Sequence, residues 1–105
     1  MTGDAPYDVT YLPLFYEDLA DAVDYIARRL QNPQAADRLI TAVEAAIAER
    51  QKSPAGYQPH PSTRARPYPY YPIRVKNYVV FYVLIDHVME VRRCLYARRD
   101  LPTLL

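Results

Sequence analysis

Three apolar segments near the C-terminus, separated by only two residues each, constrain the fold more than any other feature. They are residues 71–75, 78–85 and 88–97, and the gaps between them are Lys76-Asn77 and Asp86-His87. Gaps of two residues that contain Asn or Asp are typical of tight hairpin turns. The sequence therefore predicts three consecutive antiparallel strands. The middle segment is apolar on both faces, as expected of a central strand that is covered on both sides.

Two helices are predicted to precede these strands. After a short strand at 7–12 and then Pro13, apolar residues recur every three or four positions, which is typical of one face of a helix. Asn32-Pro33 indicates a stop and a restart, because Asn can cap a helix and Pro fits its first turn. A second apolar stripe follows, and Ser53-Pro54 ends it. The two stripes consist of Phe15, Leu19, Val23, Ile26 and Leu30, and of Ala36, Leu39, Ile40, Val43 and Ile47.

A proline-rich segment separates the helices from the three strands. Its prolines at 59, 61, 67, 69 and 72 cannot donate to a strand ladder, so a loop is expected up to about Tyr71. Because the link between the helices is short, they must lie side by side, and each keeps an apolar stripe that a sheet has to cover. The sequence thus predicts one α+β domain over residues 1–105, in the order β-α-α-β-β-β.

The net charge of +1 hides a strong asymmetry between the two halves of the chain. Residues 1–50 carry four arginines and nine acids, whereas residues 51–105 carry nine bases and three acids. This polarity favours a basic working surface on the strand side, directed at a polyanion or an acidic protein. The alternative is that the helices are acidic and the strands basic with every charge merely solvated.

Cysteine, histidine and apolar content exclude several classes of protein. The single cysteine, Cys94, rules out an internal disulfide and a multi-cysteine metal site. Two histidines, and strands without an acidic cluster, argue against a metal centre, so no cofactor is expected. Residues 1–10 lack the pattern of an export signal, and no apolar run approaches the roughly 18 residues that span a membrane. We therefore expect a cytoplasmic protein.

The last strand contains one arginine pair, and a second pair, Arg98-Arg99, follows it. Because side chains alternate along a strand, Arg92 and Arg93 are expected on opposite faces of the sheet. We expect one of the two to pair with a carboxylate of the first helix, such as Glu17 or Asp21. The other guanidinium would then meet an anion outside the fold.

An ordered set of motifs resembles a known family. "NPQAADRL" opens the second helix, "YPIRVKNYVVFYVL" spans the first hairpin, and "VRRCLYARRDL" ends the last strand. Over about residues 7–101 the chain resembles the RelE/ParE superfamily of toxins from type II toxin–antitoxin modules, which include plasmid-stabilization systems. The resemblance implies a helical hairpin packed on one side of a curved, mainly antiparallel four-stranded sheet, with a basic concave face on the other side. It also implies action in the bacterial cytoplasm and neutralisation by a cognate antitoxin.

The superfamily has two branches with different targets. RelE-like members are mRNA interferases that cleave messenger RNA on the ribosome without a metal, and ParE-like members inhibit DNA gyrase. Arg74 and Arg98 match RelE-like basic positions. Tyr96 is the first candidate for a substitute general base, and His60 is the second. However, Val79 replaces a strand arginine, Pro72 replaces a lysine, and the tail "LPTLL" offers neither Tyr nor His.

These departures favour the ParE-like branch slightly. The nuclease reading remains an alternative, with Arg74, Arg98 and Tyr96 as its catalytic residues. A second alternative is a family member that binds its partner but is not toxic. In any of these readings, contacts to a partner or to RNA are expected from Lys76, Tyr78, Tyr82, Arg92, Arg93 and Arg99. For Tyr78 and Tyr82, which share a strand face, packing in the core is the competing explanation.

Overall fold

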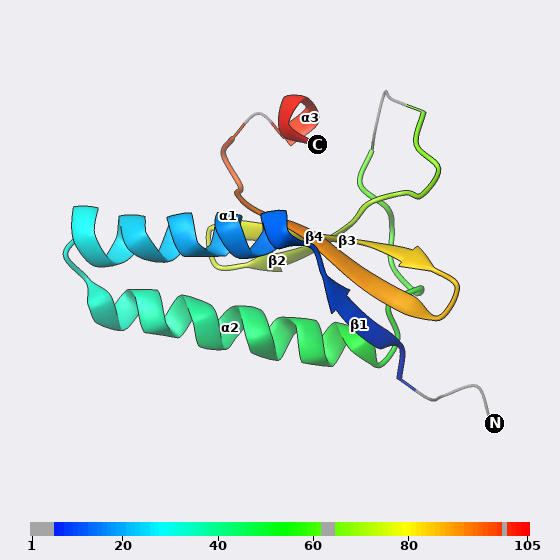
Figure 1. Ribbon diagram of the computed structural model, residues 1–105, viewed down its shortest axis with the longest axis horizontal. Helices are drawn as coiled ribbons and strands as arrows, with labels where there is room; N and C mark the ends of the chain where they lie inside the picture. The colour runs from blue at the N-terminus through cyan, green and yellow to red at the C-terminus, as the bar shows by residue number, and fades with distance from the viewer. Residues whose placement is uncertain (1–5, 62–64, 100) are drawn as a thin grey trace.

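The chain folds as a helical hairpin on a four-stranded sheet, which confirms the predicted α+β class and element order (Figure 1). The computed structural model describes residues 6–61, 65–99 and 101–105, with Pro102 and Thr103 described by their backbone alone. The elements are β1 (Asp8–Tyr11), α1 (Pro13–Asp24), the π-helical turn η1 (Tyr25–Arg29), α2 (Pro33–Gln51), β2 (Tyr71–Val75), β3 (Tyr78–Ile85), β4 (Val88–Tyr96) and the short α3 (Leu101–Leu104).

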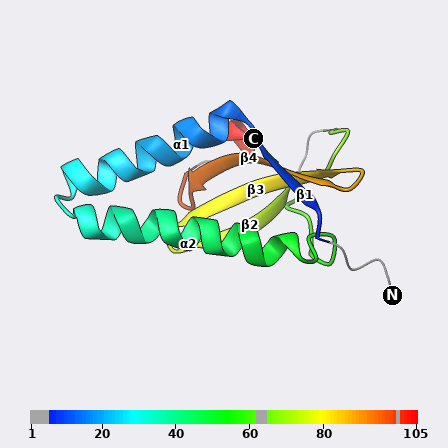
Figure 2. The ribbon, with the colours of Figure 1, turned by 60° about the horizontal axis from the view of Figure 1, so that its bottom comes forward.

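The sheet has the strand order β1-β4-β3-β2. Strands β2, β3 and β4 form the two predicted hairpins, and β1 pairs in parallel with the first half of β4. A parallel neighbour needs a crossover connection, and the helical hairpin provides it. Both helices therefore cover the same face of the sheet, and their linked ends extend past the ends of the strands (Figure 2).

Local signals explain where the helices begin and end. Pro13 and Pro33 occupy the first turns of α1 and α2, where a missing backbone N–H is harmless. The Asn32 side chain accepts a hydrogen bond from the Ala35 backbone N–H at 3.1 Å, which confirms the predicted cap. Between the two helices, η1 adds a wider turn, and Gln31 takes a left-handed conformation with φ of 51°.

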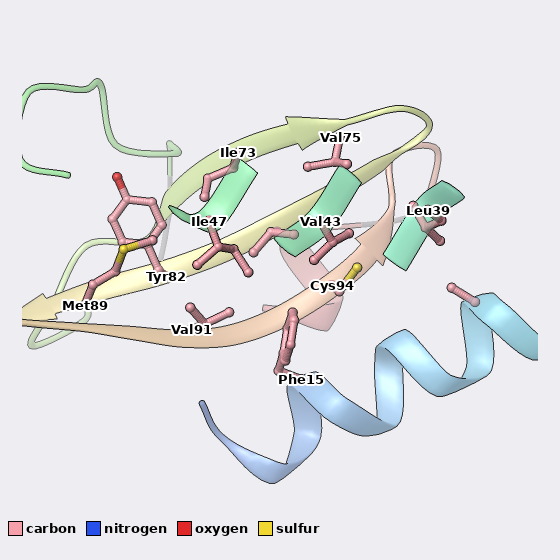
Figure 3. Close-up of a cluster of buried hydrophobic side chains, with 12 residues drawn as sticks. Phe15, Leu39, Val43, Ile47, Ile73, Val75, Tyr82, Met89, Val91 and Cys94 are labelled. Carbon is pink, nitrogen blue, oxygen red and sulfur yellow. The ribbon is translucent and has the colours of Figure 1, made fainter. Parts of the chain in front are cut away.

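The main core lies between the helices and the sheet. Apolar side chains of both helical stripes meet those on the helix-covered face of β2, β3 and β4 (Figure 3). Burial of such side chains is the dominant favourable term in folding, at about 25 cal/mol for each Å² of apolar surface. The buried residues include Phe15, Leu39, Val43 and Ile47 from the helices and Val80, Tyr82, Met89 and Val91 from the strands.

A second apolar cluster covers the opposite side of the sheet, which we call the outer face. Val79, Phe81 and Leu95 form its floor, and Phe81 is fully buried. Tyr70 of the proline-rich loop packs against them, together with leucines of the C-terminal segment. This cover explains why β3 is apolar on both faces, as the sequence indicated.

A β-bulge in β4 changes where the first arginine pair points. Phe81 pairs with Arg93, and Tyr82 pairs with Val91, so Arg92 is an extra residue on β4. Arg93 lies on the outer face because its partner Phe81 belongs to the outer-face cluster. Arg92 follows Val91, whose side chain is in the main core, so Arg92 lies on the outer face as well. The prediction that they point to opposite faces is therefore wrong. Strict alternation fails at a bulge, and the sequence carries no signal for this one.

Candidate functional site

A groove of about 660 Å³ lies between the linked ends of the helices and the end of the sheet that carries the β2–β3 turn. One wall comes from α1, η1 and α2, and the other comes from the β2–β3 turn and the end of β4. The groove exists because the helical hairpin extends beyond the strands, so the last turns of α1 and the first turn of α2 have no strand beneath them (Figure 2). We call these two sides the helix wall and the sheet wall.

The helix wall carries large apolar side chains that are open to solvent. Tyr25 and Leu30 are 49% and 57% exposed, although both are large apolar side chains. Ala22 and Ala35 are small residues of the same wall. Exposed apolar side chains that gather at one concave place mark an interaction surface.

The sheet wall carries two tyrosines at the end of the β3–β4 ladder. Tyr78 and Tyr96 are cross-strand partners, and their rings pack edge to face with centroids 5.5 Å apart. Burial raises the pKa of Tyr78, and the neighbouring thiol of Cys94 raises it further. The phenol of Tyr78 is therefore neutral at physiological pH. The two side chains offer ring faces and hydroxyl groups to the groove.

Charged residues of opposite sign stand on the two walls. Lys76 and Arg99 belong to the sheet wall, and Asp18 and Asp21 belong to the helix wall. Within the described parts of the chain, no ion pair engages Lys76, Arg99 or Asp21. Their charges are therefore available to a bound partner, whereas that of Asp18 is not.

Asp18 is held by Arg93 in a two-armed ion pair. The Arg93 Nε and Nη2 donate to the two carboxylate oxygens at 2.8 and 3.0 Å, and the side chains are only 18% and 11% exposed. Asp18 also accepts a hydrogen bond from the Cys94 backbone N–H at 3.0 Å. The prediction that one arginine pairs with an acid of the first helix is correct in kind, but the acid is Asp18 rather than Glu17 or Asp21.

Neither arginine of the pair is left without a partner inside the fold. Arg92 donates to Glu90 at 2.7 Å and to the Tyr70 hydroxyl at 3.4 Å. Arg93 donates to the Leu104 carbonyl as well as to Asp18. Hydrogen bonds to Tyr70 and Glu90 raise the pKa of Arg92, and the hydrogen bond to Asp18 raises the pKa of Arg93. The expectation that one arginine of this pair meets an anion outside the fold is therefore wrong, because Glu90 and Asp18 neutralise both arginines.

Three of the six expected contact residues do meet in one place. Lys76, Tyr78 and Arg99 line the groove, and Tyr96 joins them there. Tyr82 cannot contact a partner, because it is fully buried in the main core. Its hydroxyl accepts a hydrogen bond from Arg50 and donates one to the Pro54 carbonyl, so it anchors the start of the proline-rich loop.

The residues proposed for RNA cleavage do not form one site. Arg74 lies between Ile73 and Val75, whose side chains are in the main core, so Arg74 points to the outer face. Tyr96 lines the groove on the other side of the sheet. The strand ends at Tyr96, and the Arg99 backbone N–H turns back to its carbonyl at 3.0 Å.

Arg98 therefore lies within this turn and does not share a strand face with Tyr96. His60, the second candidate base, packs edge to face on Phe81 of the outer face, with ring centroids 5.3 Å apart. Tyr96 and His60 thus belong to opposite sides of the sheet.

Several groove residues were assigned to the core from the sequence. Leu30 continues the helical stripe and was expected to be covered by the sheet, but it is exposed, whereas Ile26 packs against the main core as expected. Tyr25 was not singled out. Periodicity identifies an apolar face but not whether a strand reaches it.

Metal and membrane sites receive no support from the described part of the chain. No group of three His, Cys, Asp or Glu residues lies close enough there to hold a metal ion. Among the helices of that part, none is long and apolar enough to cross a bilayer. Burial raises the pKa of the Cys94 thiol to about 12, so it is not a reactive thiolate.

Comparisons with known proteins agree with this architecture. The family model described as "ParE toxin of type II toxin-antitoxin system, parDE" matches residues 9–101. One similar solved structure is the "Chromosomal ParDE TA system from P. aeruginosa", with a TM-score of 0.72 and 11% sequence identity. The alignment covers 88% of this chain and 97% of that chain. No curated protein matches the chain significantly.

Proposed function

The chain belongs to the ParE toxin family of type II toxin–antitoxin systems, and from this premise we propose that it arrests bacterial growth by inhibiting DNA gyrase. We further assign its neutralisation to a cognate antitoxin that binds the groove. Membership of the ParE family, over residues 9–101, is the observation that carries the choice of gyrase over the ribosome.

The arrangement of the charged residues supports a toxin that acts by binding. Metal-free RNA cleavage needs a general base and cations for the phosphate on the same side of the protein. Arg74 belongs to the outer face and Tyr96 to the groove, on the other side of the sheet. Arg92 and Arg93 are neutralised by Glu90 and Asp18. These positions favour inhibition of an enzyme over hydrolysis of RNA.

The groove has the properties expected of a protein-binding site. It combines exposed large apolar side chains with charges that have no ion-pair partner among the described residues. Interfaces commonly have an apolar, aromatic-rich centre with a charged rim. An antitoxin segment that fills the groove would bury Tyr25, Leu30 and Tyr96.

Two assays on the same protein test the proposed target. We expect its induction in a bacterial host to stop growth and to induce the DNA-damage response. We expect the purified protein to inhibit supercoiling by gyrase and to leave messenger RNA on translating ribosomes uncut. Normal supercoiling in the presence of excess protein would contradict the gyrase proposal. Codon-specific cleavage on ribosomes would instead support the nuclease reading, and unaffected growth would support the non-toxic one.

Co-expression tests the proposed partner. If a short gene beside this one encodes a DNA-binding module with an acidic and apolar tail, we expect its product to restore growth. We also expect the two proteins to co-purify as a complex. Failure of that neighbour both to bind and to restore growth would contradict the assignment of an antitoxin.

A further inference from the structure

We propose that two copies of this chain associate through their β1 strands, which pair antiparallel and join the two four-stranded sheets into one. β1 is an edge of the sheet, because the strand order is β1-β4-β3-β2. An open edge strand is a template for pairing with another chain. Such a dimer would form whether or not the protein inhibits gyrase.

The backbone groups of alternate β1 residues point toward β4 or away from it. The N–H groups of Asp8 and Leu12 donate to carbonyls of the β3–β4 turn and of β4, at 3.1 and 2.9 Å. In a strand, every second residue directs its N–H and C=O to the same side. Val9 and Tyr11 therefore direct theirs off the sheet, and no hydrogen bond among the described residues engages these groups.

The open stretch is bounded at both ends. Gln51 occupies both outward groups of Tyr7, since its carbonyl accepts from the Tyr7 N–H and its side chain donates to the Tyr7 carbonyl. Pro13, at the other end, has no N–H to offer. The stretch thus offers the backbone of Val9 and Tyr11.

A second copy that runs antiparallel presents the same two residues in reverse order. Val9 of each copy then faces Tyr11 of the other, and each such pair exchanges two hydrogen bonds. A shift of the register by two residues would set Tyr7 or Pro13 in the seam and lose one pair. The edge is therefore complementary to itself in one register.

This register sets no like charges of β1 opposite each other. Thr10 of one copy stands opposite Thr10 of the other on the two-fold axis, and paired threonines are favourable cross-strand neighbours. Asp8 stands opposite Leu12. The two Asp8 carboxylates lie four positions apart along the seam, or about 13 Å at about 3.3 Å for each residue. Salt screens exposed charges beyond about 8 Å at physiological ionic strength.

Two exposed tyrosines flank the open edge. Tyr11 and Tyr16 are 38% and 55% exposed, and their ring centroids are 5.6 Å apart. Val9 packs against the main core, and Tyr11 shares its strand face, so both side chains lie on the helix side of the seam. In the dimer each Tyr11 ring stands beside Val9 of the other copy. Tyrosine suits such a place, because its ring is buried while its hydroxyl stays in water.

The other edge of the sheet is protected against pairing. Pro72 of β2 has no N–H, and its carbonyl accepts a hydrogen bond from Arg50 at 3.1 Å. Arg74, two residues further along β2, adds an exposed charge. Proline and charge are devices by which proteins prevent edge-to-edge association. Residues 9–11 of β1 carry neither, so the two edges differ in the property that matters for dimer formation.

The seam is small and lies away from the groove. β1 pairs with residues 88–91 of β4, whereas Cys94, Leu95 and Tyr96 line the groove, so the dimer leaves both grooves open. A whole tyrosine presents about 150–250 Å², so the exposed parts of Tyr11 and Tyr16 amount to about 200 Å² in each copy. Stable complexes bury about 1,200–2,000 Å². This dimer is therefore weak and forms reversibly as the concentration rises.

A symmetric disulfide tests the register. Residues that face each other in a non-hydrogen-bonded antiparallel pair have Cα atoms about 4.5 Å apart, which a disulfide can span. We expect Thr10→Cys to form a covalent dimer under mild oxidation. Asp8→Cys is the matched control, because its two copies would lie about 13 Å apart and should not cross-link. The native Cys94 is buried and does not compete.

Sedimentation velocity tests the association of the full chain. Between about 10 µM and 1 mM we expect the parent protein to shift from monomer to dimer. Tyr16→Ser and Tyr11→Ser should each weaken association by about tenfold, because both remove apolar contact at the seam. Tyr68→Ser should not, since Tyr68 is 37% exposed, like Tyr11, but lies in the proline-rich loop. Circular dichroism confirms that each variant is folded.

The contrary outcomes are distinct. A parent protein that stays monomeric over the whole range would overturn the proposal. Equal cross-linking of Asp8→Cys and Thr10→Cys would overturn the antiparallel register, and a dimer unaffected by both tyrosine variants would place the interface elsewhere. A dimer that does not inhibit gyrase would contradict the proposed function and leave the β1 pairing intact.

Discussion

Arg93 of β4 and Asp18 of α1 form a two-armed ion pair between residues that are 75 positions apart in the sequence. The pair closes the edge of β4 where β1 ends, because Asp18 also accepts the Cys94 backbone N–H. It stands beside the bulge that brings Arg93 to the outer face. A single arginine thus ties together the helix layer, the open strand edge and, through the Leu104 carbonyl, the C-terminal segment.

Removal of this carboxylate should destabilise the fold strongly. Asp18→Ala leaves a mostly buried guanidinium and a backbone N–H without their acceptor, so we expect a loss of about 2–4 kcal/mol in the free energy of unfolding. Urea denaturation of the purified protein measures it. The control is Asp24→Ala, which breaks the exposed pair with Arg28 and should cost less than about 0.5 kcal/mol. Equal effects of the two substitutions would show that the buried pair is not structural.

The hydroxyl of Tyr82 should matter for stability and not for partner binding. Tyr82→Phe removes the bridge between Arg50 and the Pro54 carbonyl, with an expected cost of about 1–2 kcal/mol. Tyr57→Phe is the matched control, because its ring stacks on the Arg50 guanidinium at 3.5 Å without an assigned role for its hydroxyl. Thermal denaturation and antitoxin affinity are measured for both. A loss of affinity without a loss of stability in Tyr82→Phe would contradict the placement of this residue.

Cys94 should be unreactive in the folded protein and should make the fold sensitive to alkali. Burial raises the pKa of its thiol from 9.0 to about 12. At mild alkaline pH the folded chain then has on the order of a thousandfold less thiolate than the unfolded chain, and alkylation should slow accordingly. Rates with and without denaturant give the comparison. Fast labelling of the folded protein would contradict the burial of this thiol.

The same shift gives a pH dependence of stability. Since the unfolded thiol ionises first, the stability that Cys94 contributes is complete below pH 9.0 and is lost as the pH rises toward 12. Burial raises the pKa of Tyr82 as well, which acts in the same direction. We expect urea denaturation midpoints to fall over this window, and to fall less steeply in Cys94→Ala. An unchanged slope in that variant would assign the effect to the tyrosines alone.

Leu30 should be required for neutralisation and dispensable for folding. It is 57% exposed at the helix wall, so Leu30→Ser should leave stability within about 0.5 kcal/mol of the parent. Loss of its contact should weaken antitoxin binding by about tenfold or more, as for other central apolar interface residues. Growth rescue by the antitoxin is compared with that of Leu14→Ser. Full rescue of Leu30→Ser would place the antitoxin elsewhere on the protein.

Much of the fold could be predicted because it depends on short stretches of sequence. Asn32-Pro33 set the cap and the restart of the second helix, and the two-residue gaps set both hairpins. The family resemblance could be stated for the same reason, as its motifs follow this order of elements. Side-chain alternation assigns Arg74 to the outer face only once the burial of Ile73 and Val75 is known.

The amino-acid sequence by itself determined which helices and strands form, their order along the chain and their apolar faces. Turns, caps and periodicity act within a few residues, so they can be recognised without the tertiary structure. Tertiary structure alone decided the partners of Arg92 and Arg93, the burial of Tyr82 and the existence of the groove. The groove depends on how far the helices extend past the strands. The partners of Arg92 and Arg93 depend on the bulge in β4, which places Arg92 on the same face as Arg93. Such contacts join segments tens of residues apart, where local preferences no longer constrain the chain.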